Sequence, residues 1–287
     1  MKLVISLAVV LARGALRTIG KLCGRVPLYP LVVLTYHGVG GRQRPAFSRQ
    51  MDVAARYARL VSAASCGTGS SLFPRLAVTF DDGFRSFREN ALPKLSEMNV
   101  PCTLFVPAGF VGRAATWVPA GCVRYRDEVV MCAEELALLP QSSICIGSHA
   151  WTHADLTTLP AECVRMELSQ SKTCLEALLG REVTTLAFPY GEYNAEVLAL
   201  CREVGFRRVF SNLPVAPDSS ETGFHVGRLN VDPDDLAIEY WLKIRGGYSW
   251  LPAAVRLKRT IRTTVGLRRR GRILLPPLEN QDENRER

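Results

Sequence analysis

The chain has 287 residues, of which 47% are hydrophobic and 22% charged, and its formal net charge at neutral pH is +9. This composition excludes an intrinsically disordered chain and is sufficient for one substantial hydrophobic core. The nine cysteines are scattered without a C-x-x-C pair, which indicates small buried side chains in a reducing compartment, not a disulfide framework.

The amino-terminal segment is apolar and then basic. Leu3–Ala12 follows Lys2 and has the length of a signal-peptide core, and by itself it is too short to span a bilayer. Arg13, Arg17 and Lys21 come next and recur at helical spacing, which disfavours signal cleavage and is typical of a basic amphipathic helix. We therefore expect a cytoplasmic protein bound peripherally to the inner membrane face, with export as the alternative.

The net positive charge of the chain lies in its two flanks. Residues 1–51 carry eight basic and no acidic residues, residues 243–272 carry ten basic and no acidic ones, and residues 52–242 carry sixteen basic against twenty-three acidic. Basic segments interleaved with aliphatics favour an anionic membrane surface, although two solvated basic helices would have the same composition. No aromatic stacking platform accompanies them, so nucleic acid is not an expected partner.

Short apolar strands alternate with segments of helical spacing along the middle of the chain. Helices are predicted at Ala161–Leu179 and at Glu196–Val204, the latter ending at Gly205. This alternation predicts a parallel sheet with helices outside it, either open or closed into a barrel. The predicted strands are Leu31–Tyr36, Ala77–Phe80, Thr103–Val106, Ile144–Ile146, Leu186–Phe188, Arg208–Phe210 and Val226–Val231.

Two adjacent carboxylates end the second of these strands. Asp81 and Asp82 follow the apolar run, and Gly83 permits a tight turn that directs both side chains to one place. Two neighbouring like charges destabilise a fold unless a cation, hydrogen bonds or solvent compensates them. The pair therefore indicates either a solvated turn or a cation site.

Two of the four histidines, His149 and His153, lie four residues apart directly after the predicted strand Ile144–Ile146. At that spacing both imidazoles can reach one cation from one face of a helix or turn. Two imidazoles and one carboxylate make a three-ligand set with open positions, as a catalytic metal requires, whereas a structural zinc site is usually closed by four ligands.

Three motifs in this order resemble the polysaccharide deacetylase family, which is built on the NodB homology domain (carbohydrate esterase family 4). They are T-F-D-D-G at Thr79–Gly83, H-x-x-x-H at His149–His153 with Ala150 in place of the usual hydroxyl residue, and F-P-Y-G at Phe188–Gly191. The resemblance covers about residues 28–235. Leu34–His37 and Leu242–Trp250 further resemble bacterial members found with exopolysaccharide biosynthesis.

The resemblance implies a distorted (β/α)7 barrel at residues 28–250, with basic flanks at 1–27 and 251–287. It also implies a metal-dependent hydrolase that removes the N-acetyl group from an amino sugar in a polysaccharide or lipid-linked glycan. A glycan-binding pseudoenzyme, another metal-dependent C–N amidohydrolase on the same scaffold and a membrane-associated scaffold protein remain as alternatives, and the oligomeric state is open.

The family's residue roles transfer to particular positions. By resemblance, Asp81 is the general base and Asp82, His149 and His153 hold a divalent metal, with Zn²⁺ the default and Co²⁺ or Ni²⁺ the alternatives. The metal would activate a water and polarise the acetamide carbonyl, and the backbone N–H of Tyr190 would help to hold the oxyanion.

The chain departs from the family pattern in two places. The late L-x-H motif that supplies the general acid is replaced by Val226–Val231, so the acid is either His37, after the first strand, or His225. We prefer His37, because barrel active sites gather at the carboxyl ends of the strands. The arginine that usually pairs with the general base is also missing, because Ala187 occupies its position. Arg228 is the candidate to compensate for this loss, and we expect it among the residues around the substrate.

Overall fold

The computed structural model describes residues 1–26, 28–65, 67, 71–119, 121–213 and 223–255. It divides the chain into two compact units, Met1–Pro252 and Ala253–Arg287. All elements discussed below belong to the first unit. Most of the predicted basic extension, residues 256–287, lies outside the described residues, and the three-part division of the chain remains a prediction.

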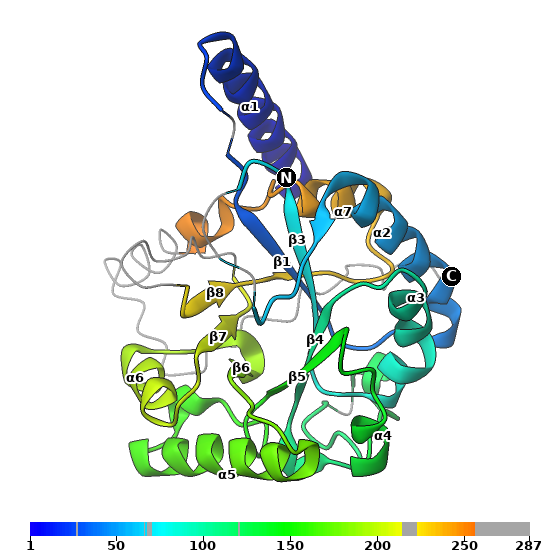
Figure 1. Cartoon of the computed structure of the whole chain (residues 1–287), viewed down its shortest axis with the longest axis vertical. Coiled ribbons are helices and arrows are strands. Elements are labelled where there is room, and N and C mark those ends of the chain that lie inside the picture. Colours follow the sequence, from blue (N-terminus) through cyan, green and yellow to red (C-terminus); the bar gives the residue numbers. More distant parts are fainter. Residues whose placement is uncertain (27, 66, 68–70, 120, 214–222, 256–287) are drawn as a thin grey trace. The chain divides into compact units, whose positions relative to one another are not determined.

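Nine described strands form one sheet, and every pair of neighbours within it is parallel (Figure 1). The order is β8-β7-β6-β5-β4-β3-β1-β9, with β2 beside β3. The strands are β1 Leu31–Tyr36, β2 Arg59–Leu60, β3 Arg75–Phe80, β4 Cys102–Val106, β5 Ile144–Ser148, β6 Thr185–Ala187, β7 Arg208–Ser211, β8 His225–Gly227 and β9 Leu229–Asn230.

One short segment nearly closes this sheet into a barrel. β8 pairs with β7, and β9, which begins only two residues later, pairs with β1 on the other side. Arg228 is the residue between them, and its backbone N–H still bonds to the Ser211 carbonyl oxygen of β7 at 2.9 Å. The predicted continuous strand Val226–Val231 is therefore two short strands, each paired with a different neighbour.

Alternation along the strands separates two apolar clusters. A small cluster fills the barrel interior and includes Val33, Ala77, Phe105 and Phe210. A much larger one, which includes Leu34, Val78 and Leu104, packs the other face of the strands against the helices. Because successive side chains of a strand point to opposite faces, these neighbours in sequence serve different cores.

The helices lie outside the strands (Figure 1). They are α1 Lys2–Leu22, α2 Arg44–Tyr57, α3 Leu92–Glu97, α4 Ala133–Ala137, α5 Ala161–Leu179, α6 Ala195–Glu203 and α7 Ala237–Ile244. The Asn194 side chain caps α6 by accepting from the Val197 N–H at 2.8 Å, and α5 ends at Gly180 in the left-handed region. The predicted bounds of α5 are confirmed, as is the barrel fold.

Helix α1 is longer than the apolar run Leu3–Ala12 predicted. It covers 21 residues, an 18-residue window of it has a mean hydropathy of 1.7, and it is long and apolar enough to cross a membrane by length and composition. The expectation concerned the run Leu3–Ala12 alone, and the greater length arises because the helix continues through Arg13 and Arg17. A signal sequence near the amino terminus has the same properties.

Candidate active site

The residues predicted to carry the chemistry gather at one end of the barrel. Asp81 and Asp82 follow β3, His149 follows β5, and His37 follows β1. All strands are parallel, so their carboxyl ends share one rim. Register brings His37 beside Asp81, because Tyr36 pairs with Phe80 and the Asp81 N–H bonds to the Tyr36 carbonyl oxygen at 2.9 Å.

Asp81 is buried and paired with Arg228. The guanidinium donates to both carboxylate oxygens, at 2.6 and 2.8 Å, and also to Asn212 Oδ1 at 2.8 Å. Arg228 has no exposed surface, and its guanidinium lies over the rings of Phe105 and Phe210. Such a fork-to-fork pair fixes both position and charge.

This pairing determines the charge state of Asp81. Burial alone would raise the pKa of the carboxyl, but the positive charge and hydrogen bonds of Arg228 outweigh burial and lower the pKa to about 2. Asp81 is therefore ionised at neutral pH. Arg228 lies where a charge partner for Asp81 belongs, and its full burial leaves it no surface for direct contact with a substrate.

Asp82, His149 and His153 converge on one point. One possible ligand atom from each lies within 4.8 Å of the other two, and all three residues are buried. Asp82 Oδ1 lies 3.2 Å from His153 Nε2 and 3.7 Å from His149 Nε2. Asp82 Oδ1 is also a buried oxygen that lacks a hydrogen bond of good geometry. A divalent cation would satisfy this oxygen, so the donor set fits the expected metal.

The protonation states also suit a metal ligand set. Burial lowers the pKa of His149 to about 4, so its imidazole is neutral at pH 7. Its Nδ1 lies 2.8 Å from the Ala187 carbonyl oxygen, which leaves Nε2 facing Asp82. Burial would raise the pKa of Asp82, but the close approach of the His153 ring lowers it.

The two histidines lie on a strained loop and not on a helix. Ala150 and His153 have φ values of +61° and +60°, and Asp82 has +69°, a region that non-glycine residues seldom adopt. Glu167 of α5 holds this loop, because its carboxylate accepts from the N–H groups of Trp151 and Thr152 at 2.9 and 2.8 Å. No motif or spacing around Glu167 indicates this role in the sequence.

The two candidate acids occupy different places. His37 is half-buried at the rim, and its ring lies 6.1 Å from that of Tyr125. His225 begins β8, and its Nε2 lies 2.9 Å from Ser211 Oγ. The structure therefore places His37, but not His225, at the carboxyl end of its strand beside the carboxylate pair.

Aromatic rings surround the histidines. Tyr190, in a turn with φ of +59°, is 43% exposed, and its ring meets that of His153 edge to face at 4.9 Å. The ring of Trp117 stacks on that of His153, with the two ring centroids 4.6 Å apart. Trp117 belongs to the long connection after β4, and only its residue type, suited to stacking on sugars, could have pointed to it in the sequence.

Comparison with known proteins agrees with the family resemblance. Residues 70–209 match the sequence profile of the family described as "Polysaccharide deacetylase". This segment of the chain is similar to the polysaccharide deacetylase family. The matched segment contains all three motifs, and the resemblance expected from them is confirmed.

The similar proteins carry related names. A chitin deacetylase of Pestalotiopsis sp is 30% identical over 137 residues, which cover 48% of this chain and 41% of that protein. IcaB from Ammonifex degensii is 25% identical with a TM-score of 0.63, over 75% of this chain and 97% of IcaB. The Streptococcus pyogenes deacetylase PplD, solved with acetate, shares the fold with a TM-score of 0.61 at 17% identity, over 76% of this chain and 99% of PplD. The chain spans about half the length of the curated relatives it matches.

Proposed function

We propose that this protein is a metal-dependent hydrolase that removes the acetyl group from an N-acetylated amino sugar in a glycan and releases acetate. The observation that carries the proposal is the convergence of Asp82, His149 and His153 beside an ionised Asp81. The deacetylase names of the relatives agree with it. The donor set, one carboxylate and two imidazoles, suits Zn²⁺, with Co²⁺ or Ni²⁺ as alternatives.

A divalent ion held by these residues would supply Lewis-acid chemistry, which eases deprotonation of water and polarises the acetamide carbonyl. Asp81 accepts the proton of the attacking water, and Arg228 holds the Asp81 carboxylate in place and ionised. The backbone N–H of Tyr190 stabilises the oxyanion that forms on the carbonyl oxygen.

The leaving amine needs a proton when the C–N bond breaks. His37 supplies it in this proposal, since it lies on the same rim as Asp81 and on a neighbouring strand. Its proton goes to the sugar nitrogen as the C–N bond breaks, and the first products are the free amine and acetic acid. Acetic acid then ionises to acetate, and the proton on Asp81 returns to His37, so that atoms and charge balance.

The substrate is proposed to be a polysaccharide or a lipid-linked glycan of exopolysaccharide biosynthesis. Two observations support this proposal. IcaB is similar in structure to this chain, and helix α1 gives the protein an apolar surface beside the barrel. We propose a cytoplasmic location with α1 against the inner membrane face, and export as the alternative. A lipid-linked glycan would then be deacetylated faster than the same glycan free in solution.

The test is acetate release from N-acetylglucosamine oligomers by the purified chain. We expect release that a chelator abolishes and that added Zn²⁺ or Co²⁺ restores. The Asp82→Ala variant should release none under the same conditions. Acetate release that is unaffected by chelation and by Asp82→Ala would contradict the proposal.

A further inference from the structure

Helix α1 packs against the barrel through its less apolar face. Ser6 and Val10 are its buried residues, and the Ser6 hydroxyl accepts from Trp250 Nε1 at 3.0 Å. A Cβ on Gly247 would come within 2.9 Å of Val10 and 3.0 Å of the Ser6 carbonyl oxygen, so only glycine permits this approach. One turn further on, Arg13 donates to the Gly246 carbonyl oxygen at 3.1 Å.

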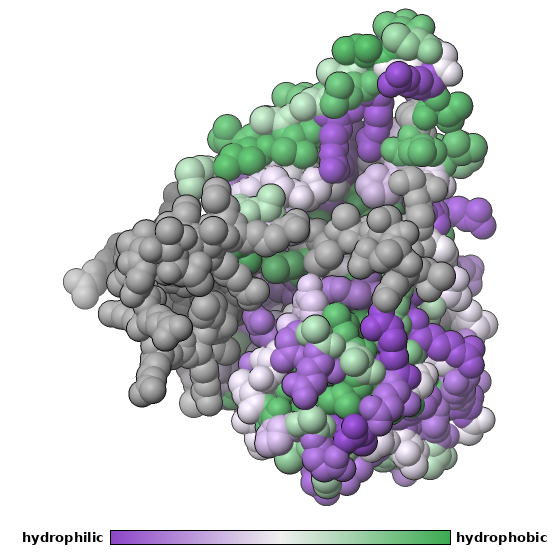
Figure 2. Space-filling view, turned by 90° about the vertical axis from the view of Figure 1, so that its left-hand side faces the viewer, coloured by the Kyte–Doolittle hydropathy of each residue, from purple (hydrophilic) through white to green (hydrophobic). Residues whose placement is uncertain are grey.

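The opposite face of α1 is left to the surroundings and is strongly apolar. Figure 2 shows the green, hydrophobic surface of this helix at the top of the view. A row of exposed apolar side chains is unfavourable in water and marks a site of contact with a protein or a membrane. The exposed side chains, each between 39% and 83% accessible, are Val4, Leu7, Leu11, Leu16, Ile19 and Leu22.

A pocket lies where the docked face of α1 meets the amino-terminal ends of β1 and β3. It is a small, partly open hollow, lined by Arg17, Tyr29, Tyr57, Arg75 and Arg245 together with Pro30, Val32, Pro74 and Ile244. It contains no acidic side chain. Because the catalytic residues follow the carboxyl ends of the strands, this pocket is separate from the site described above.

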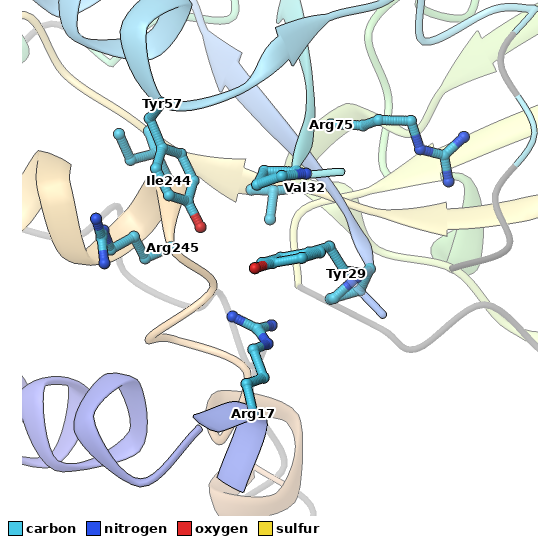
Figure 3. Close-up of a pocket in the computed structure, with 9 residues that line it drawn as sticks. Arg17, Tyr29, Val32, Tyr57, Arg75, Ile244 and Arg245 are labelled. Carbon is cyan, nitrogen blue, oxygen red and sulfur yellow. The ribbon is translucent and has the colours of Figure 1, made fainter. Parts of the chain in front are cut away.

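The polar groups of the pocket converge. In Figure 3 the hydroxyl ends of Tyr29 and Tyr57 and the guanidinium of Arg17 point toward one another, whereas the guanidinium of Arg245 lies beside Tyr57 and points away from the other three. Arg17 lies 4.2 Å over the Tyr29 ring, and Arg245 lies 4.8 Å over that of Tyr57. Arg75 points away and donates to the Gly67 carbonyl oxygen at 2.7 Å.

Arg17 and Arg245 both lack a counter-charge. Among the residues that the structure describes, no carboxylate lies within 4.0 Å of Arg17 or Arg245, and Arg245 Nε is buried without a hydrogen-bond partner. Aromatic faces hold both guanidinium groups in place but leave their N–H donors free. Arginine forks and hydroxyl donors around a small hollow match a tetrahedral oxyanion such as phosphate.

We propose that this pocket binds the phosphate of an anionic lipid headgroup while the apolar face of α1 enters the acyl region. The adjoining row of exposed aliphatics favours a lipid over a soluble phosphate, because one bilayer would satisfy both features. This inference does not rest on the deacetylase proposal.

The test measures the melting temperature of the full chain in neutral detergent micelles, with and without added lipid. Phosphatidylglycerol should raise the Tm of the wild type by about 3 °C or more, as expected for a ligand that binds only the folded state. Phosphatidylcholine, whose ammonium group opposes the arginines, and inorganic phosphate at the same concentration should give a much smaller rise.

Variants assign the effect to the pocket. The Arg17→Gln/Arg245→Gln double variant should lose the phosphatidylglycerol rise, whereas Arg42→Gln, an exposed arginine next to the other end of β1, should keep it. Arg245→Lys retains the charge and protects against loss of folding, and its rise should be reduced. An undiminished rise in the double variant would overturn the proposal. An equal rise with inorganic phosphate would overturn the assignment to a headgroup.

Discussion

At the scale of single residues, the site depends on how the Asp81 charge is held. Its carboxylate is almost completely buried, and Arg228 supplies a fully buried cation in a bidentate pair. A buried charge without a partner is strongly unfavourable. The pair therefore contributes to both the stability of the barrel rim and the protonation state of the general base in the proposed mechanism.

Replacing Arg228 tests this coupling. Arg228→Met should destabilise the fold by about 3–5 kcal/mol, because it leaves Asp81 buried and unpaired. It should also raise the pKa of Asp81, so that the acidic limb of the kcat/KM profile moves to higher pH. Denaturant unfolding and a pH–rate profile measure the two effects, and Arg228→Lys, which keeps the charge, should show smaller changes in both.

The same pair gives the wild type a pH dependence of stability. The folded pKa of Asp81 is about 2, below the ordinary value of 3.8. A carboxyl with a lowered folded pKa stabilises the native state above its unfolded pKa and ceases to do so as the pH falls through the folded value. The contribution of Asp81 should therefore be complete above about pH 4 and be lost between pH 4 and pH 2. In Asp81→Asn this loss should be absent.

The acid is tested by comparing two histidines. His37→Gln should lower kcat about 10²- to 10⁴-fold, because the leaving amine then lacks its proton donor. Metal content should not change. His225→Gln is the matched control, since His225 bonds to Ser211 at the start of β8, and its kcat should stay within a few fold. Equal losses in the two variants would remove His37 from the mechanism.

At the scale of elements, the loop after β5 depends on a helix far from it in sequence. Glu167 of α5 accepts from the N–H groups of Trp151 and Thr152 and from the Thr152 hydroxyl. It thereby holds His153 in its left-handed conformation. Outer contacts of this kind orient a metal ligand, and their loss lowers the affinity for the metal.

We therefore expect Glu167→Gln to weaken metal binding about 10- to 100-fold with little loss of secondary structure. Glu162→Gln, in the exposed first turn of the same helix, is the control and should bind metal as the wild type does. Titration with Zn²⁺ against a competing chelator measures both affinities. Identical affinities would show that the loop holds its shape without Glu167.

Many of the helices and strands could be predicted from the sequence. The apolar run Leu31–Tyr36 and the helical spacing of Ala161–Leu179 are local, and the structure has both elements with those bounds. Pairing between distant segments is not local. The role of Arg228 depends on Val226–Val231 inserting between β7 and β1, and no spacing within that segment reveals which strands it joins.

The site shows the same division. Asp81, Asp82, His149 and His153 carry a recognisable spacing, so they could be named as candidates from the sequence. Glu167 could not, because it contributes through contacts made only in the folded chain. The residue type of Trp117 suits sugar stacking, but its contact with His153 could not be predicted. The strained φ values of Asp82 and His153 are likewise a consequence of tertiary packing and leave no mark on residue type.

At the scale of the whole molecule, α1 combines two opposed surfaces. Val10 is buried against the barrel, and its neighbour Leu11 is 61% exposed. Val10→Gln should lower the free energy of unfolding by roughly 1–3 kcal/mol, because a polar group replaces a buried apolar one. Leu11→Gln should leave stability within about 0.5 kcal/mol of the wild type but reduce partition into lipid vesicles. If both variants behave alike, α1 is not docked as described.

The central claim is that four side chains, Asp81, Asp82, His149 and His153, make one metal-dependent hydrolytic centre. The most direct test measures bound metal and acetate release together in the wild type, Asp81→Asn and His153→Ala. We predict about one divalent ion per chain in the wild type and in Asp81→Asn, with turnover only in the wild type, and loss of both in His153→Ala. Full metal occupancy and normal acetate release in His153→Ala would contradict the account.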